Sequence, residues 1–202
     1  MTKVKSAVTE NQAHVIESVS AGELHKMLVS GVSTGVAIVA CSEMDVCAKL
    51  PKEQDLPILV WQNFGASVDD SGGLLDVLVE SNISDVVIFG HYPCEIVELG
   101  LRADLVEDPK LSPGHEHFMG LMRATRSKMR AKFGDRFDRE VMMKATQDFI
   151  VRQAEAIFEL KRYNPVLADR TIRVHAWLDL PEISDVWQYD SKCHSFCTRL
   201  LV

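Results

Sequence analysis

Short apolar runs rich in β-branched residues alternate with longer helical patterns along this chain. The four strand-like runs are 35–41 (GVAIVAC), 57–63 (PILVWQN), 85–91 (DVVIFGH) and 171–180 (TIRVHAWLDL). Helical patterns cover 11–30, 71–82, about 115–132 and 138–163, and another helix is expected to begin around Pro93. Strands that alternate with helices are typical of right-handed βαβ crossovers. The sequence therefore predicts an α/β fold, a single domain with a mainly parallel central sheet flanked by helices.

Composition and charge narrow the class of protein. The chain has 202 residues, of which 47% are hydrophobic and 25% charged, which is ordinary for one globular domain. Its net charge of -7 gives no electrostatic reason to bind nucleic acid or anionic lipid. The sequence shows neither a secretory signal nor an apolar run of the roughly 20 residues that span a bilayer. We therefore expect a cytoplasmic protein, with neither nucleic acid nor a membrane as partner.

Three residues of metal-binding types fall at one predicted edge of the sheet. Cys41 and His91 each end a predicted strand, and Cys94 follows at a helix N-terminus. Ligands of open α/β sheets bind outside the carboxyl ends of the strands. Two thiolates and an imidazole suit Zn²⁺ and leave a fourth position to be filled, and the helix dipole is expected to lower the pKa of Cys94. The alternative is that these buried cysteines serve only as small apolar side chains.

Five segments resemble the β-class carbonic anhydrases, in the same order and over about residues 30–190. "ACSEMD" resembles the A-C-S-D-S-R segment of that family, and "VVIFGHYPCEIVE" resembles its strand ending in G-H-x-x-C-G. Weaker matches are "VWQNFGASVDDSGG" to R-N-A-G-N, "FIVRQAEAIFEL" to the N-V-x-x-Q helix, and "IRVHAWLDLPEISDVWQYD" to the V-H-G-W-x-Y-D strand pair. The chain is therefore similar to this family over most of its length.

The resemblance implies a zinc enzyme that hydrates carbon dioxide to bicarbonate. Cys41, His91 and Cys94 would be the zinc ligands, and a zinc-bound hydroxide would attack carbon dioxide. It also implies a homodimer or tetramer, with residues 1–30 as an N-terminal helical arm laid over the partner and residues 31–202 as the zinc domain. Phe64, Val68, Leu74 and Leu75 would wall the substrate pocket of the neighbouring subunit.

The chain departs from the family beside the metal. The family has Asp two residues after its first Cys and Arg two residues later, whereas this chain has Glu43 and Asp45. Gln62 replaces an Arg and Glu95 replaces a Gly, and both are predicted to line the substrate pocket. Glu43 and Asp45 are the predicted catalytic residues, but neighbouring carboxylates repel where the family's Arg would attract.

Three functions remain open at this stage. Glu43 could hydrogen-bond the zinc-bound hydroxide in a working anhydrase, with Lys49 or Arg102 replacing the lost Arg. Alternatively, Glu43 could occupy the fourth zinc position permanently and seal a non-catalytic Cys₂HisGlu site. The third possibility is a hydrolase of carbonyl sulfide or carbon disulfide. Met44 and Gln62 would make the substrate pocket more apolar than that of the family, which would suit such a substrate.

Several cysteines and histidines lie outside this pattern. Cys193 and Cys197 would share one face if the tail is helical, either as ligands of a second metal or as thiols against a partner subunit. An odd total of five cysteines is more typical of thiols and metal ligands than of a disulfide framework. His115 and His117 could line a ligand or lie exposed near a helix start, and His175 is expected to be a satisfied sheet histidine.

Overall fold

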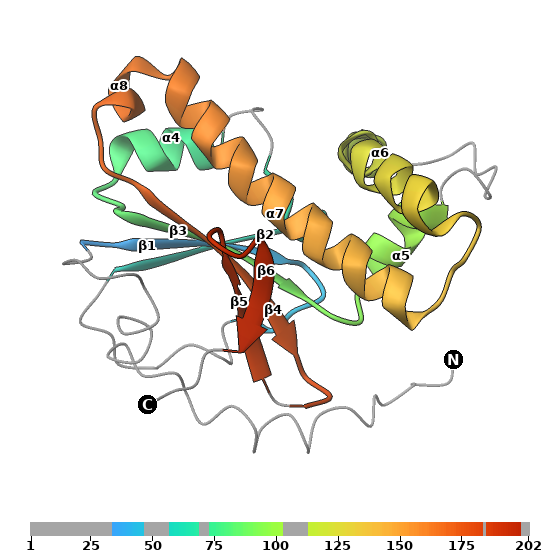
Figure 1. Cartoon of the computed structure of the whole chain (residues 1–202). Coiled ribbons are helices and arrows are strands. Elements are labelled where there is room, and N and C mark those ends of the chain that lie inside the picture. Colours follow the sequence, from blue (N-terminus) through green and yellow to red (C-terminus); the bar gives the residue numbers. More distant parts are fainter. Residues whose placement is uncertain (1–33, 47–56, 69–72, 103–112, 184, 199–202) are drawn as a thin grey trace, which may run out of the picture.

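The computed structural model describes residues 34–46, 57–68, 73–102, 113–183 and 185–198. They form one α/β domain with a six-stranded, mainly parallel sheet, which confirms the predicted fold class (Figure 1). In chain order the elements are β1 (Val36–Cys41), β2 (Ile58–Asn63), the 3₁₀ turn η1 (Phe64–Ala66), α4 (Gly73–Glu80), β3 (Asp85–His91), α5 (Glu95–Arg102), α6 (Pro113–Phe133), α7 (Arg139–Tyr163), α8 (Pro165–Ala168), β4 (Arg173–Leu180), β5 (Asp185–Asp190) and β6 (Ser195–Thr198). The predicted arm 1–30 lies outside the described residues, as do Cys47 and Lys49.

The sheet has the strand order β2-β1-β3-β4-β5-β6. β2, β1, β3 and β4 are parallel to their neighbours, whereas β5 and β6 add antiparallel strands at one end. β1 is buried along its whole length, and β3 is buried except at His91, which explains their continuous apolar sequences. Figure 1 shows α4 and α7 on the same side of this sheet, with α7 running diagonally across it.

The close contact between α7 and the sheet depends on a glycine. A Cβ atom on Gly90 of β3 would lie only 2.3 Å from Cδ1 of Ile150 on α7, so the absence of a side chain lets the helix approach the strand. Phe149, the neighbouring residue on α7, is fully buried and packs edge-on against Phe118 of α6, with ring centroids 5.4 Å apart. The strand that ends at His91 is therefore held between its neighbours and a packed helical layer.

Two local expectations are corrected by the structure. Pro93 follows a cis peptide bond and lies before α5, which begins at Glu95, so it is not in the first helical turn. The segment around 193–197 forms a turn and strand β6 instead of a helix. Tyr189 on β5 and Phe196 on β6 are direct cross-strand partners, and their rings lie 5.5 Å apart. This aromatic pair favours the hairpin because cross-strand contacts stabilise antiparallel strands.

His175 is paired within the sheet, as expected for a structural histidine. Its Nε2 atom lies 3.0 Å from Oδ1 of Asp85, whose side chain is fully buried at the start of β3. Arg173 donates two further hydrogen bonds to the same carboxylate, at 2.7 and 2.6 Å, and these bonds raise the pKa of Arg173. This ion cluster ties β3 to β4 at the end of the strands opposite to His91.

No helix in the described part of the chain is long and apolar enough to cross a membrane.

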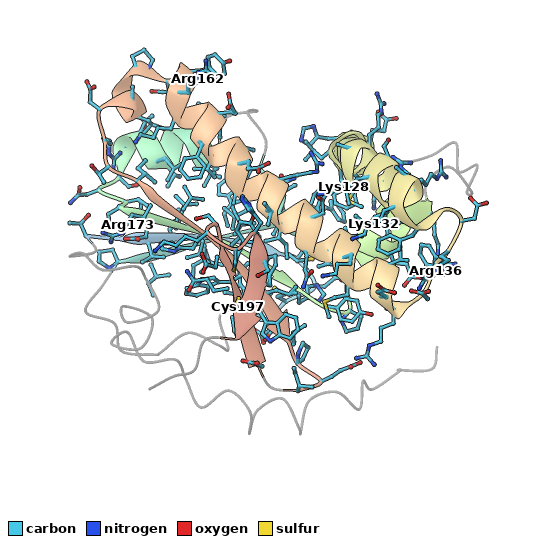
Figure 2. The ribbon with its side chains drawn as sticks, viewed as in Figure 1. Lys128, Lys132, Arg136, Arg162, Arg173 and Cys197 are labelled. Atoms are coloured by element: carbon cyan, nitrogen blue, oxygen red, sulfur yellow. The ribbon has the colours of Figure 1, made fainter. Side chains whose placement is uncertain are left out.

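Charged contacts join the long helices α6 and α7. Asp148 on α7 accepts hydrogen bonds from Thr125 Oγ1 and Arg152 Nε, each at 2.7 Å, and from Lys128 of α6 (Figure 2). Burial opposes ionisation of Asp148, but these three donors together hold its pKa below the ordinary value.

We predict that Asp148→Asn lowers the free energy of unfolding at neutral pH by about 1.5–3 kcal/mol, because charge-assisted hydrogen bonds are lost. The pKa of Asp148 is lower in the folded state than in the unfolded state, so its ionised carboxylate stabilises the fold at pH values above the unfolded-state pKa of about 3.9. This stabilisation is lost as the pH falls through the pKa of the folded state. The difference between wild type and variant in urea unfolding should therefore shrink from pH 7 to pH 3.

The matched control is Glu159→Gln, which removes an exposed carboxylate whose partner Arg162 is 3.9 Å away. Its effect should stay within about 0.5 kcal/mol. An Asp148→Asn difference that is the same size at both pH values would contradict the electrostatic explanation.

Candidate metal centre

The turn after β1 is held in place by the neighbouring edge strand. Cys41 is the last residue of β1, and its carbonyl accepts a hydrogen bond from the Met44 N–H at 3.0 Å, which closes a tight turn. Gln62, near the end of β2, donates its side-chain Nε2 to the carbonyl of Met44 at 2.6 Å and to that of Cys41 at 3.3 Å. The turn that carries Glu43 is thus held by its own backbone hydrogen bond and by the side chain of Gln62 on β2.

The segment after β3 brings two further side chains to the same edge. His91 is the last residue of β3, and Cys94 directly precedes α5, where its carbonyl accepts the Glu98 N–H at 3.1 Å. The Tyr92 N–H donates to the carbonyl of Asp179 on β4 at 2.9 Å, which anchors the connecting loop. Parallel β1 and β3 therefore deliver Cys41, His91 and Cys94 to one edge of the sheet.

Four potential ligand atoms converge at this edge. The sulfur of Cys41, one Glu43 carboxylate oxygen, a ring nitrogen of His91 and the sulfur of Cys94 all lie within 4.8 Å of one another. The two sulfurs are 3.9 Å apart and both cysteines are buried. The distance from His91 Nε2 to Glu43 Oε2 is 3.3 Å. In the described residues this is the one group of three or more such donors, so it is the candidate metal centre.

Glu43 reaches the centre from its turn and contacts the start of α5. Its Oε2 atom accepts a hydrogen bond from the Glu95 backbone N–H at 3.2 Å, and about 28% of its side chain is exposed. The carboxylate lies at the first N–H of the helix, where the helix dipole favours a negative charge. Glu43 therefore has a defined position beside the thiols even though it is the most exposed of the four donors.

The two buried thiols influence each other's protonation strongly. The hydrogen bond with Cys94 lowers the pKa of Cys41 to about 4, against the opposing effect of burial. The same bond, together with burial, raises the pKa of Cys94, so the helix dipole does not dominate as the sequence suggested. Burial lowers the pKa of His91, but the neighbouring Cys41 thiolate and the charge of Glu43 outweigh it and raise the value overall. The pair thus carries one negative charge, and a cation bound to both sulfurs would promote loss of the second proton.

The donors present fit a zinc-type ion. Among the described residues, the buried Nε2 atom of His91 makes no hydrogen bond of standard geometry, and Glu43 Oε2 lies 3.3 Å away from it as a charged neighbour. A buried nitrogen without a partner is costly unless a ligand binds it. Two sulfurs, one imidazole nitrogen and one carboxylate oxygen are also a donor set that tetrahedral zinc accepts. Cys41, His91 and Cys94 could therefore hold the ion, with Glu43 at the fourth position.

The other residues predicted beside the metal are not among the four converging donors. Asp45 lies exposed at the end of the turn and is not one of the four converging donors. Gln62 binds the backbone of the turn through its side chain, and Glu95 contacts Glu43 through its backbone. Arg102, considered as a substitute for the missing arginine, pairs with Glu98 at 2.8 Å and stacks 4.1 Å over Phe137.

The predicted pocket residues lie in the interior next to the sheet. Phe64 packs against the ring of His115, with ring centroids 4.5 Å apart, and His115 is half-buried. His117 is exposed to solvent. Leu74 on α4 is buried and Leu75 is half-buried. Val68 is buried, and its N–H donates to Oε1 of Gln153 on α7 at 2.8 Å. Each of these residues makes core contacts within the described chain.

Two residues near the site were not singled out from the sequence. Asp179 of β4 is in register with His91, and its negative charge contributes to the raised pKa of His91. Gln153 belongs to the family-like helix segment, and it fixes the loop after η1 through Val68. The position of Asp179 at the carboxyl end of a predicted strand was the available signal, because that edge also carries Cys41 and His91.

The arrangement was compared with known proteins. No family model matches the sequence, and no curated protein matches it by sequence. Solved structures do match. The β-carbonic anhydrase CcaA aligns with a TM-score of 0.66 and 17% identity, covering 88% of this chain and 90% of that chain.

Two further solved structures give the same result. A Coccomyxa β-carbonic anhydrase in complex with acetazolamide aligns with a TM-score of 0.58 and 20% identity, over 79% of this chain and 74% of that one. A tetrameric β-carbonic anhydrase from Sordaria macrospora aligns with a TM-score of 0.57 and 15% identity, over 89% of both chains. The topology and these alignments together show that this chain has the fold of the β-class carbonic anhydrases.

Proposed function

We propose that this protein is a zinc-dependent carbonic anhydrase of the β type, which interconverts carbon dioxide and bicarbonate. The observation that carries the proposal is the convergence of Cys41, His91, Cys94 and Glu43 at the carboxyl edge of a sheet with the β-carbonic anhydrase topology. A zinc ion held by the three stronger donors would supply the Lewis acid that allows water to react with carbon dioxide at neutral pH.

The chain's own residues then have separate tasks. Cys41, His91 and Cys94 bind the ion, and their burial keeps the donor set rigid. Glu43 Oε2 accepts the Glu95 N–H while it lies beside His91, and from this position the carboxylate would be able to accept a hydrogen bond from a water at the fourth position and orient it. Gln62 supports this role by fixing the turn on which Glu43 lies. Asp45 remains a proposed catalytic residue through its charge beside that turn.

A sealed, non-catalytic zinc protein is the second candidate, and one observation favours it. Glu43 Oε2 lies 3.3 Å from the ring nitrogen of His91, and within the described chain Glu43 has no lysine or arginine partner that would draw it away. A carboxylate held at the fourth position would exclude water. The hydrolase alternative gains no comparable support, because Gln62 binds the backbone and Met44 is buried.

The oligomeric state is proposed from the fold. The Sordaria macrospora structures are described as tetrameric, and we propose a homodimer or tetramer for this chain by analogy with that fold. The absence of a nucleic-acid partner stays a prediction from the net charge of -7. A cytoplasmic location stays a prediction from composition.

We predict one zinc ion per chain in purified protein, measured by inductively coupled plasma mass spectrometry. Changes in groups that only orient metal ligands typically weaken zinc binding by about 10- to 100-fold. Cys94→Ser removes a direct donor, so it should weaken zinc binding by more than this. Cys197→Ser is the matched control, since it changes another cysteine to serine away from the centre and should keep full zinc. A Cys94→Ser variant that retains zinc after dialysis against a chelator would contradict the assigned ligands.

We also predict carbon dioxide hydration well above the uncatalysed rate in a stopped-flow assay from about pH 7 to pH 9, with zinc fully loaded. Glu43→Ala should lower this activity by about 10- to 100-fold while zinc content is unchanged, because water is no longer oriented. Fully loaded protein without hydration at any pH would overturn the anhydrase proposal. If Glu43→Ala then gained azide binding, the sealed site would be supported instead.

A further inference from the structure

A second pair of cysteines lies on the antiparallel hairpin formed by β5 and β6. The strands are joined by the turn 191–194, and the last paired residues before it are Asp190 and Ser195. His194 has a φ of 50°, in the left-handed region, which reverses the chain directly after Cys193. Cys193 is thereby folded back over the strand that carries Cys197, which Figure 2 labels on the hairpin.

Short contacts hold the two thiols together. The sulfurs of Cys193 and Cys197 are 3.9 Å apart. Ser195 lies between them on the same face of β6, since it is two residues from Cys197, and its Oγ is 2.9 Å from the Cys193 sulfur and 3.6 Å from the Cys197 sulfur. The carbonyl of Asp190 is a further acceptor for Cys193 at 3.8 Å. Both cysteines are exposed to solvent, so a small reagent can reach them.

The surroundings of this pair differ from those of the buried pair. Cys41 and Cys94 have the same sulfur separation of 3.9 Å, but they share their site with His91 and Glu43. Within the described chain, no third cysteine, histidine or carboxylate completes such a group around Cys193 and Cys197. Two donors are too few for a closed tetrahedral metal site, whereas two thiols suffice for a disulfide.

We propose that Cys193 and Cys197 are a modification site, at which a reversible disulfide forms within one chain by exchange with a low-molecular-weight disulfide such as oxidised glutathione. The sulfurs must approach from 3.9 Å to about 2.05 Å, which side-chain rotation on an exposed turn allows. Neither residue belongs to the metal centre, so this inference is independent of the proposed function.

The exchange is chemically balanced. One protein thiolate attacks a sulfur of oxidised glutathione, the glutathione S–S bond breaks, and one glutathione thiolate leaves as a mixed disulfide forms. The second protein thiolate then attacks the protein sulfur of that mixed disulfide and releases the second glutathione. Two protein thiols are oxidised, one glutathione disulfide is reduced to two thiols, and the two protons pass to the released glutathione.

The disulfide would close the turn beside a groove of about 510 Å³ that lies against α6 and α7. Tyr189, Ser195 and Phe196 line this groove, whereas neither cysteine does. His194 also lines this groove, and its Nδ1 lies 3.3 Å from the Tyr189 hydroxyl. Oxidation would thus lock the turn that places His194 beside Tyr189, while the groove stays open.

Tryptic digestion offers a direct test. Cleavage after Lys192 and Arg199 releases the peptide 193–199, which contains both cysteines and no other. The full-length, zinc-loaded protein is equilibrated with defined ratios of oxidised and reduced glutathione, alkylated under acidic quench, digested and analysed by mass spectrometry. We expect this peptide to lose two alkylation sites and two hydrogen masses, and to recover both on reduction.

Single variants and a denatured reference complete the design. Cys193→Ser and Cys197→Ser should each accumulate the glutathione mixed disulfide, which wild type resolves, and zinc content should not change in either. The oxidation equilibrium constant of folded wild type should exceed that of the guanidinium-unfolded chain by about tenfold, because the hairpin raises the effective concentration of one thiol near the other. Equal constants, persistent glutathione adducts on wild type, disulfide-linked dimers or two thiols that remain alkylatable would each overturn the proposal.

Discussion

The parallel pairing of β1 with β3 is the constraint on which the rest of the structure depends. The pairing runs as far as Ala40 and Phe89, so the two strands end at the same edge, where Cys41 and His91 belong to one cluster of converging donor atoms. A shift of one residue would turn every side chain of a strand to the opposite face. Burial on both faces prevents such a shift, because it would place charged residues from the strand ends among apolar neighbours. The metal centre is therefore a consequence of how the core packs.

Sequence patterns identified the parts of the structure that depend on local periodicity. The apolar runs at β1 and β3 and the long helices α6 and α7 were predicted within a few residues, and the cysteines and histidine at the strand ends followed from the topology. Long-range hydrogen bonds were not predictable in this way. Gln62 looked like a pocket residue because it replaces an arginine, but its bond to Met44 depends on a strand register that the sequence does not display. Cys193 and Cys197 were expected on one face of a helix, whereas a turn and a strand bring their sulfurs to 3.9 Å, since four-residue spacing suits a helix and a tight turn alike.

The charges around the candidate centre would favour a bound cation. Glu43 contacts His91, Asp179 adds negative charge from β4, and the two buried thiols share a further negative charge. Negative charge gathered at a buried site is unfavourable unless a cation or hydrogen-bond donors compensate for it. The family that the sequence resembles has an arginine two residues after its acid, whereas here the Glu95 N–H is the donor that the structure provides to Glu43. A cation bound at the candidate centre would therefore supply more of the compensation.

The side chain of Gln62 has a mechanical consequence. β2 is the terminal strand of the described sheet and pairs with β1 alone, while Gln62 near its end holds the turn that bears Glu43. Trp61, the preceding residue, is 37% exposed. A force that displaces the end of β2 is transmitted through two hydrogen bonds to the turn and so to the carboxylate at the metal centre. The position of the outer strand and the position of the Glu43 turn are therefore linked by the side chain of one residue.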